Sequence, residues 1–225
     1  MHIIAENLGC ERLSLPVFAN VNFRLEPGAA LVVRGANGSG KSSLLRLMAG
    51  LLSPASGSCK AFMDAMCLEG LRLGQAAHYC GHLDGLKNSL TIGESLHFFH
   101  ALSVWQDNAS SIRDDSRNSI HALTHFGLAR LGPDYPVRFL SAGQRRRLSL
   151  CRLLSQFRPL WLLDEPVVSL DEEGRAKLRE IINTHRQEGG IVVLTHHADD
   201  FVETTQTLDM NDFRLTKKPM RENKA

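Results

Sequence analysis

The five residues Leu140-Ser141-Ala142-Gly143-Gln144, LSAGQ in one-letter code, narrow the fold of this chain more than any other stretch. A glycine-rich loop of the phosphate-binding type, GANGSGKS, occupies Gly35–Ser42 earlier in the chain. That loop alone leaves kinases, small GTPases, helicases and transporters as candidates. LSAGQ is followed by WLLDEP at Trp161–Pro166. The three patterns in this order select one class of phosphate-loop protein.

The composition is that of an ordinary globular protein. The 225 residues are 43% hydrophobic and 22% charged, enough for one large or two small domains with a substantial core. A net charge of +2 gives no electrostatic reason to expect a nucleic-acid partner. The opening MHIIAENLG has no basic segment followed by an apolar one, so we expect no signal peptide. No apolar run approaches the roughly 20 residues that cross a bilayer.

The cysteines argue against a disulfide-bonded or zinc-binding protein. There are five, spread over the chain without a CxxC pair: Cys10, Cys59, Cys67, Cys80 and Cys151. An odd, scattered set is typical of a protein in a reducing compartment.

Apolar runs alternating with helical patterns predict an α/β fold. We expect short strands at His2–Glu6 and Val21–Leu25, and buried strands at Ala29–Arg34, Leu160–Asp164 and Ile191–Thr195. We expect helices at Lys41–Ala49, Gly143–Phe157 and Asp171–Glu188. This alternation indicates a mainly parallel sheet covered on both faces.

A helical segment interrupts the alternation. Thr91 and Glu94 have the spacing of a capping box and predict a helix through Ser95–Leu102. A polar stretch, Gln106–Ser119, separates it from a second helical pattern at Ile120–Phe126. We therefore predict an α/β core at 1–85 and 139–215, a helical subdomain at 86–138 and a polar tail at 216–225.

The glycine-rich loop predicts nucleotide binding. Glycines let backbone N–H groups wrap a phosphate, and the positive end of the following helix attracts it. Lys41 is expected to reach the β- and γ-phosphates of ATP, and the Ser42 hydroxyl to ligate Mg²⁺. A random chain of this length carries the GxxxxGK[ST] pattern about one time in a hundred, so chance is a poor explanation. The predicted nucleotide-binding residues here are Gly35, Ala36, Asn37, Gly38, Ser39, Gly40, Lys41, Ser42 and Ser43.

Asp164 and Glu165 end the strand expected in the WLLDEP segment. A carboxylate there can hold Mg²⁺ directly or through water, and its neighbour can polarise an attacking water. Taken alone, an Asp-Glu pair after a strand is better explained as part of a solvated loop. His196 follows the strand at Ile191–Thr195, where a histidine is more often a hydrogen-bonded loop residue than a catalytic one.

LSAGQ has the features of a second anion site. Ser141 offers a hydroxyl, Gly143 permits close backbone approach, and a helix is expected to begin there. One nucleotide needs only one such site, so the second is surplus within one chain. Taken alone, an ordinary helix N-terminus at Ser141 explains the pattern equally well. We interpret the following Arg145-Arg146-Arg147 as a solvated or docking face rather than a nucleic-acid site.

Ten histidines raise the question of a metal site. Two pairs have helical spacing, His97 with His100 and His121 with His125. No third ligand type lies nearby in the sequence, so we predict exposed histidines rather than a metal centre.

Together these motifs resemble those of the nucleotide-binding subunits of ATP-binding cassette (ABC) transporters. The resemblance implies an α/β phosphate-loop fold with a mainly parallel sheet, an N-terminal antiparallel portion and an inserted helical subdomain. It also implies Asp164 as the magnesium aspartate, Glu165 as the catalytic glutamate and His196 as the catalytic switch histidine at the γ-phosphate.

The same resemblance gives LSAGQ a partner. In ABC proteins this segment faces the γ-phosphate bound by the other subunit, which implies a homodimer with Ser141, Gly143 and Gln144 at its nucleotide. Ser169–Asp171 matches the segment at which the two subunits of such dimers meet. Asp171 is also expected to cap the helix that follows it.

Two departures from the general ABC pattern narrow the resemblance. His82, in Gly81–Lys87 (GHLDGLK), stands at the catalytic-site position where glutamine is expected. Arg12 falls near the place of the aromatic that stacks on adenine, and we expect it to stack through its guanidinium plane. Both departures resemble the haem exporter ATPases of the cytochrome c maturation system, and the resemblance covers roughly residues 3–200.

That narrower resemblance implies an ATPase that binds ATP and Mg²⁺. It would dock peripherally on an integral membrane subunit of the same ABC complex, at the cytoplasmic side of the inner (plasma) membrane. ATP hydrolysis would drive haem export or haem delivery to apocytochromes through release of a haem-loaded chaperone. No nucleic-acid partner is implied.

Two alternatives share every catalytic motif. One is an ABC ATPase of a soluble complex that assembles cofactors or proteins, as in iron–sulfur assembly. The other is the ATPase of an ABC transporter for ions or other small solutes, which a glutamine at position 82 would favour.

Overall fold

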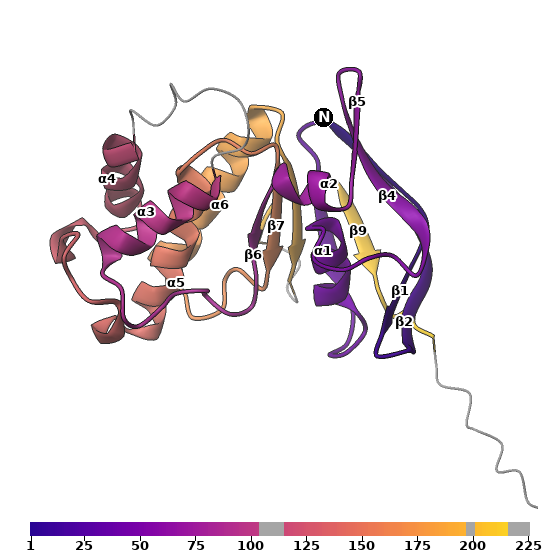
Figure 1. Cartoon of the computed structure of the whole chain (residues 1–225), viewed down its shortest axis with the longest axis horizontal. Helices are drawn as coiled ribbons and strands as arrows, with labels where there is room; N and C mark the ends of the chain where they lie inside the picture. Colours follow the sequence, from indigo (N-terminus) through magenta and orange to yellow (C-terminus); the bar gives the residue numbers. More distant parts are fainter. Residues whose placement is uncertain (104–114, 197–200, 216–225) are drawn as a thin grey trace, which may run out of the picture.

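The computed structural model describes residues 1–103, 115–196 and 201–215, which form two β-sheets and a group of helices (Figure 1). The antiparallel sheet has the strand order β2-β1-β4-β5, and the second, parallel sheet has the order β6-β7-β8-β3-β9. The expected α/β fold with a mainly parallel sheet and an N-terminal antiparallel portion is confirmed. The predicted tail 216–225 and the first part of the predicted polar stretch Gln106–Ser119 lie outside the described residues.

The strands and helices have the following bounds. The antiparallel strands are β1 (His2–Arg12), β2 (Leu15–Leu25), β4 (Ser56–Met63) and β5 (Met66–Glu69). The parallel strands are β3 (Ala30–Arg34), β6 (Ala77–Cys80), β7 (Leu160–Asp164), β8 (Ile191–Thr195) and β9 (Gln206–Asp209). The α-helices are α1 (Lys41–Met48), α2 (Leu71–Gln75), α3 (Ile92–Ser103), α4 (Asp115–His125), α5 (Ala142–Leu150) and α6 (Glu172–Gln187). Three short 3-10 helices are η2 (Ala129–Leu131), η3 (Val137–Phe139) and η4 (Cys151–Leu154).

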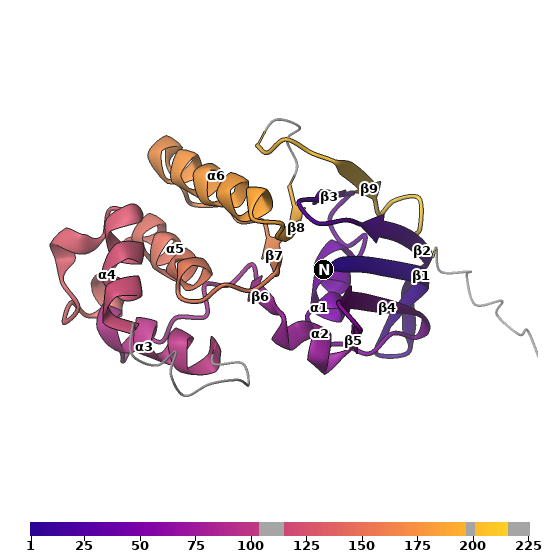
Figure 2. The same ribbon diagram turned by 90° about the horizontal axis from the view of Figure 1, so that it is seen from above.

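Alternation along the parallel strands divides the apolar side chains between two cores. In β7, Leu160 and Leu162 enter one core, while Trp161 and Leu163 enter the other, because successive residues of a strand point to opposite faces. The first core lies between the two sheets, where α1 contributes Leu44 (Figure 2). Helices α3 to α6 cover the other face of the parallel sheet and fill the second core.

The antiparallel sheet is larger than the sequence pattern predicts. The expected strands at His2–Glu6 and Val21–Leu25 are parts of β1 and β2, which continue into a hairpin whose turn residues, Leu13 and Ser14, both have positive φ. The register shifts along β1, and Asn7 has a φ of 48°. A bulge breaks the two-residue repeat of a strand, so the continuation is hidden in the sequence.

Local caps begin the helices where the sequence predicts them. Thr91 N donates to Glu94 Oε2 at 2.8 Å and Glu94 N donates to Thr91 Oγ1 at 3.2 Å, which confirms the capping box at the start of α3. Asp171 Oδ1 accepts a hydrogen bond of 3.0 Å from Gly174 N and caps α6 as expected.

Two helix bounds differ from the prediction. The helix α4 begins at Asp115, inside the stretch predicted to be a polar linker. The helix α5 ends at Leu150 rather than Phe157, because the chain tightens there into η4. The limits of the inserted subdomain, 86 and 138, remain a prediction.

Candidate functional site

The glycine-rich loop joins the carboxyl end of β3 to the start of α1. Gly35, Gly38 and Gly40 have φ angles of 129°, 78° and 104°, in the region that favours glycine. A Cβ atom on Gly40 would lie 2.8 Å from Phe18 Cδ1 and 2.9 Å from Val17 Cγ1, so there is no room for a side chain. The loop therefore brings its backbone N–H groups to a helix N-terminus, the arrangement that binds phosphate.

Lys41 is the first residue of α1 and is buried. Its Nζ donates to the carbonyl oxygen of Gly35 at 2.8 Å and to that of Ala36 at 3.2 Å. A buried ammonium group needs acceptors, and the loop supplies two. Phosphate oxygens are stronger, charged acceptors, so the side chain is placed to bind a phosphate held in this loop.

Asp164 lies at the carboxyl end of β7 and is buried. Its Oδ1 accepts a hydrogen bond of 2.9 Å from the hydroxyl of Thr195, at the end of the neighbouring strand β8. Its Oδ2 has no hydrogen-bond partner among the residues that the structure describes. A buried carboxylate oxygen is stable when a donor or a cation faces it. The Asp164 carboxylate and the Ser42 hydroxyl are oxygen donors of the kind that Mg²⁺ prefers, so the residues fit that ion.

Glu165 follows Asp164 in a strained backbone conformation, with a φ of 49°. Its N–H donates to the Thr195 hydroxyl at 2.7 Å, so one hydroxyl group holds both acidic residues. His82 Nδ1 lies 3.8 Å from Glu165 Oε2. The structure thus brings together His82 and Glu165, from the loops that follow β6 and β7. Their side chains are 62% and 25% exposed, so a ligand can reach both.

His196 and Arg12 lie at the borders of this arrangement. His196 directly follows Thr195, so it lies at the same edge of the sheet as Asp164, and its ring packs against Phe201 with centroids 5.5 Å apart. Arg12 ends β1 and is exposed. It belongs to the hairpin whose second strand packs against the glycine-rich loop. Its contact with adenine remains a prediction.

Ser141 and Gln144 form a reciprocal cap at the start of α5. Gln144 N donates to Ser141 Oγ at 3.3 Å, and Ser141 N donates to Gln144 Oε1 at 2.9 Å. The cap uses one acceptor site on each side-chain oxygen and leaves the hydroxyl hydrogen and the amide NH₂ as donors. Ser141 is exposed. This end of α5 therefore offers donors to an anion that approaches from outside the chain.

Gly143 is packed against the chain segment before α6. A Cβ atom on Gly143 would lie 3.1 Å from the carbonyl oxygen of Ser169, a tight contact. The LSAGQ helix and the glycine-rich loop belong to opposite faces of the parallel sheet, because α1 packs into the first core and α5 into the second (Figure 2).

The arginine run after LSAGQ is not a solvated face, so that alternative was wrong, while a docking role remains untested. Arg145 Nε donates to Asp84 Oδ2 at 2.9 Å, and Arg147 Nη2 donates to Asp171 Oδ2 at 2.6 Å. Arg146 is 5% exposed and bonds to backbone carbonyl groups. Successive helix residues point about 100° apart, so three neighbouring side chains reach three loops that are distant in the sequence.

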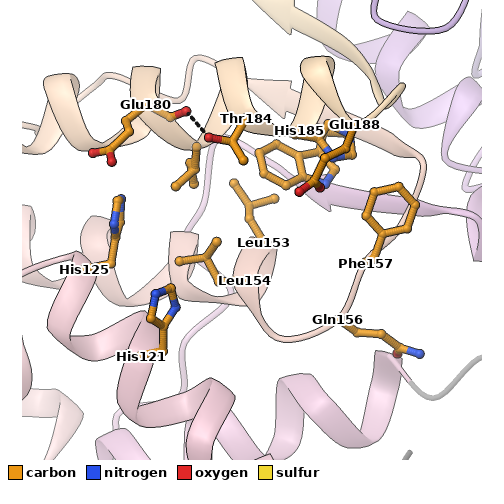
Figure 3. Close-up of a pocket in the computed structure, with 12 residues that line it drawn as sticks. His121, His125, Leu153, Leu154, Gln156, Phe157, Glu180, Thr184, His185 and Glu188 are labelled. Carbon is orange, nitrogen blue, oxygen red and sulfur yellow. Dashed lines mark hydrogen bonds between the residues drawn. The ribbon is translucent and has the colours of Figure 1, made fainter.

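A cavity of about 330 Å³ lies between α4, η4 and α6 (Figure 3). Its floor includes Trp161 and His185, whose rings stack with centroids 4.0 Å apart. Burial lowers the pKa of His185 to about 4, so this imidazole is neutral at physiological pH. Phe157 and Trp161 place the cavity at the amino end of β7, away from Asp164 at the carboxyl end. It is therefore separate from the candidate site.

The predicted exposure of the paired histidines is only partly correct. His97 and His121 are exposed, whereas His100 is buried and His125 is half-buried, with its Nε2 3.1 Å from the carbonyl oxygen of Lys177. Figure 3 shows His121 and His125 along α4, on the side that faces α6. The expectation fails because both helices pack into the second core. Across residues 1–103, 115–196 and 201–215, no group of three or more His, Cys, Asp or Glu is arranged to hold a metal ion.

The chain is similar to known ATP-binding proteins along most of its length. The sequence pattern of the ABC transporter family matches residues 18–168. The chain is 42% identical over 214 residues to the cytochrome c biogenesis ATP-binding export protein CcmA of Paramagnetospirillum magneticum, covering 95% of each. It is 39% identical to the protein of that name from Agrobacterium fabrum, covering 95% of this chain and 97% of the relative. It is 41% identical to the protein of that name from Rhodospirillum rubrum, covering 92% of this chain and 85% of the relative.

Solved structures share the fold at lower identity. An ABC transporter ATP-binding protein from Pyrococcus furiosus superposes with a TM-score of 0.75 and 20% identity, over 96% of this chain and 100% of that chain. An ATP-binding cassette solved as a dimer in a post-hydrolysis state, with ADP and Pi, has a TM-score of 0.70 and 20% identity. The match covers 88% of this chain and 89% of that chain.

Replacing Thr195 by valine tests whether its hydroxyl holds the two acidic residues. The change keeps the branched shape but leaves Asp164 Oδ1 and Glu165 N–H without their partner. We expect the free energy of unfolding, measured by urea denaturation, to fall by about 1–3 kcal/mol. We expect the rate of ATP hydrolysis to fall by on the order of 10²-fold, because Glu165 is displaced.

Thr205→Val is the control, the same substitution at an exposed threonine whose hydroxyl also bonds the backbone. The Thr205 hydroxyl also makes two hydrogen bonds, one from Ala30 N at 2.9 Å and one to Ala30 O at 3.0 Å, but at the opposite end of β3. We expect this variant to lose stability and keep its hydrolysis rate. Hydrolysis by Thr195→Val at the wild-type rate would show that the Thr195 hydroxyl does not position the acidic pair.

Proposed function

This chain belongs to the ABC transporter family, and we propose that its two anion-binding ends form a two-site ATPase between two copies of the chain. It is the ATP-hydrolysing subunit of a cytochrome c biogenesis ABC exporter of the CcmA type, since it is 38–42% identical to proteins of that name over 95% of its length. The observation that carries the proposed mechanism is the bonded set of Asp164, Thr195 and Glu165, with His82 beside it, at one edge of the parallel sheet.

We propose that the phosphates of ATP bind in the loop from Gly35 to Ser43, on backbone N–H groups. The Lys41 ammonium group, which bonds the carbonyl oxygens of Gly35 and Ala36, contacts the β- and γ-phosphates in this proposal. Arg12 stacks on the adenine ring. Ser42 and Asp164 are the proposed ligands of Mg²⁺, which when bound neutralises the charge of the phosphate oxygens.

Glu165 is the proposed catalytic base. Its carboxylate accepts a hydrogen bond from the attacking water and orients the water towards the γ-phosphorus. The Thr195 hydroxyl accepts a hydrogen bond from its backbone N–H, and His82 Nδ1 lies 3.8 Å from its Oε2, so its backbone is fixed and an imidazole lies close to its carboxylate. His196, at the end of β8, is proposed to contact the γ-phosphate.

The second half of each site comes from the partner copy in this proposal. The donors of Ser141 and Gln144 and the backbone at Gly143 close over the γ-phosphate that the other chain binds. The support is that LSAGQ and the glycine-rich loop belong to opposite faces of the sheet, while the cap leaves the Ser141 hydroxyl hydrogen and the Gln144 NH₂ group available as donors. ABC ATPase subunits act as dimers on membrane subunits, which gives each donor end a nucleotide to bind.

No helix in the part of the chain that the structure describes has the length and apolar character to cross a bilayer. We propose that the protein docks peripherally on an integral membrane subunit of its complex, at the cytoplasmic side of the inner membrane. Closure of the dimer would change the conformation of that subunit, and hydrolysis would release a haem-loaded chaperone for delivery to apocytochromes. No observation favours a soluble assembly ATPase or another small-solute transporter.

Replacing Lys41 by alanine in cells tests the cytochrome c assignment. The change removes the ammonium group at the phosphate loop, so we expect covalently bound haem in c-type cytochromes, detected by haem staining of membranes, to be lost. Lys60→Ala is the control, because Lys60 is a surface residue 3.9 Å from Glu69 on the antiparallel sheet. Unchanged c-type cytochromes in the Lys41→Ala cells would refute the assignment to this pathway.

Replacing Glu165 by glutamine tests the two-site mechanism. The amide keeps the size of the side chain but cannot accept a proton, so we expect hydrolysis to fall by on the order of 10²–10⁴-fold. Because ATP binding is retained, the variant should form a stable dimer with ATP, measured by size-exclusion chromatography with light scattering. Adding Ser141→Ala should weaken that dimer. Normal steady-state hydrolysis by Glu165→Gln would remove Glu165 as the catalytic base.

His82 tests the departure from the family's glutamine. Glutamine, like imidazole, can donate a hydrogen bond to a carboxylate, so we expect His82→Gln to retain most of the ATPase activity. His82→Ala removes the partner of the carboxylate, and we expect kcat to fall by on the order of 10²-fold. Full activity of the alanine variant would show that His82 does not hold Glu165.

A further inference from the structure

Arg146 is a buried arginine whose hydrogen bonds all go to backbone carbonyl groups in the described structure. Its Nε donates to Pro166 O at 3.2 Å and its Nη1 to Gly81 O at 3.0 Å. Its Nη2 donates to Asp164 O at 3.1 Å and to Glu165 O at 2.9 Å. The residue is 5% exposed. One guanidinium group therefore binds the ends of two neighbouring strands, β6 and β7.

This arrangement is costly for the fold alone. A buried charge without a directly bonded carboxylate loses its hydration and gains only the weaker attraction of carbonyl dipoles. Burial accordingly lowers the pKa of the Arg146 guanidinium. A neutral apolar side chain of similar volume would avoid that cost but would leave the four carbonyl groups without this donor, so the arginine is tied to the position of these carbonyl groups.

Arg146 connects the two loops that carry His82 and Glu165, the residues proposed to act in ATP hydrolysis. Gly81 directly precedes His82. The other carbonyl groups belong to Glu165, the proposed catalytic base, and to its two neighbours, Asp164 and Pro166. The planar guanidinium fork fixes its acceptors in a defined geometry. It therefore sets the loop that carries His82 at a fixed position relative to the strained backbone of Glu165.

Arg146 also belongs to the helix that begins at LSAGQ. Ser141 and Gln144 cap α5, and Arg146 lies in the same helix. The donors proposed to bind the partner's γ-phosphate and the group that holds the Glu165 backbone are thus parts of one short rigid element.

We propose that Arg146 is a positioning residue for ATP hydrolysis, which holds the Glu165 carboxylate and the His82 imidazole in register with each other and with the LSAGQ helix. This inference rests on the proposed role of Glu165. Arg146 reaches these groups only through the backbone, so it acts on the rate of the chemical step and not on the affinity for ATP.

The test compares Arg146→Gln and Arg146→Lys with the same change at a half-buried arginine, Arg158. Arg158 also donates to a backbone carbonyl group, that of Ala77 at 2.7 Å, but at the start of β6 rather than its end. Steady-state kcat and KM for MgATP and the free energy of unfolding are measured for each full-length variant. We expect Arg146→Gln to lower kcat by on the order of 10- to 10²-fold with KM nearly unchanged.

The controls separate positioning from folding. Arg158→Gln should lose stability and keep its kcat. Arg146→Lys keeps the charge but reaches fewer of the four carbonyl groups, so its kcat should lie between those of the wild type and Arg146→Gln. Where Arg146→Gln does not fold, Arg146→Lys decides: a reduced kcat with unchanged KM supports the proposal. A wild-type kcat in either Arg146 variant, or a changed KM with unchanged kcat, overturns it.

A Glu165→Gln background tests whether Arg146 acts through Glu165. Residues that act as one unit are not additive, so adding Arg146→Gln should barely change the residual single-turnover rate, and the ATP-bound dimer should still form. Additive losses would overturn the inference. Wild-type hydrolysis by Glu165→Gln alone would instead refute the proposed function of Glu165, which distinguishes the two failures.

Discussion

The register of β7 on β8 is the constraint on which the rest of this structure depends. The parallel pairing places Asp164 beside Thr195 and Leu160 beside Ile191. Sliding β7 by one residue would exchange its two faces, because side chains alternate along a strand. Trp161 and Leu163 would then enter the core between the sheets, and Asp164 would lose the Thr195 hydroxyl. The packing that stabilises the fold and the geometry of the acidic pair are therefore set by the same ladder of hydrogen bonds.

Features that depend on local chemistry could be predicted from the sequence. The phosphate loop, the buried strands and the caps at Thr91 and Asp171 involve residues a few positions apart, so their spacing is visible in the chain. The strand β1 was predicted too short because a bulge near Asn7 hides its repeat. The elements β4, β5, α2, β6 and β9 escaped prediction, since four are only four or five residues long and β4 buries few of its side chains.

The parts of the site that the sequence does not reveal are long-range contacts. Thr195 reads as the end of an apolar strand, yet its hydroxyl joins Asp164 to Glu165. Arg146 reads as the middle of a polar run, yet it is buried against loops that follow β6 and β7. The available signals were a polar residue, Thr195, at the end of an otherwise apolar strand and three consecutive arginines directly after a helix cap. Neither states which partner it meets, because the partners are set by strand order.

The reciprocal cap at Ser141 and Gln144 has a consequence for assembly. Each side-chain oxygen accepts one hydrogen bond within the helix, while the Ser141 hydroxyl hydrogen and the Gln144 NH₂ group remain as donors at the surface. A phosphate group offers several charged acceptor oxygens to these donors and binds them more strongly than a neutral acceptor would. In the proposed homodimer, the γ-phosphate of ATP lies between the LSAGQ segment of one chain and the glycine-rich loop of the other. In that dimer, the bound ATP is therefore also a main contact between the chains, and its hydrolysis would weaken the dimer.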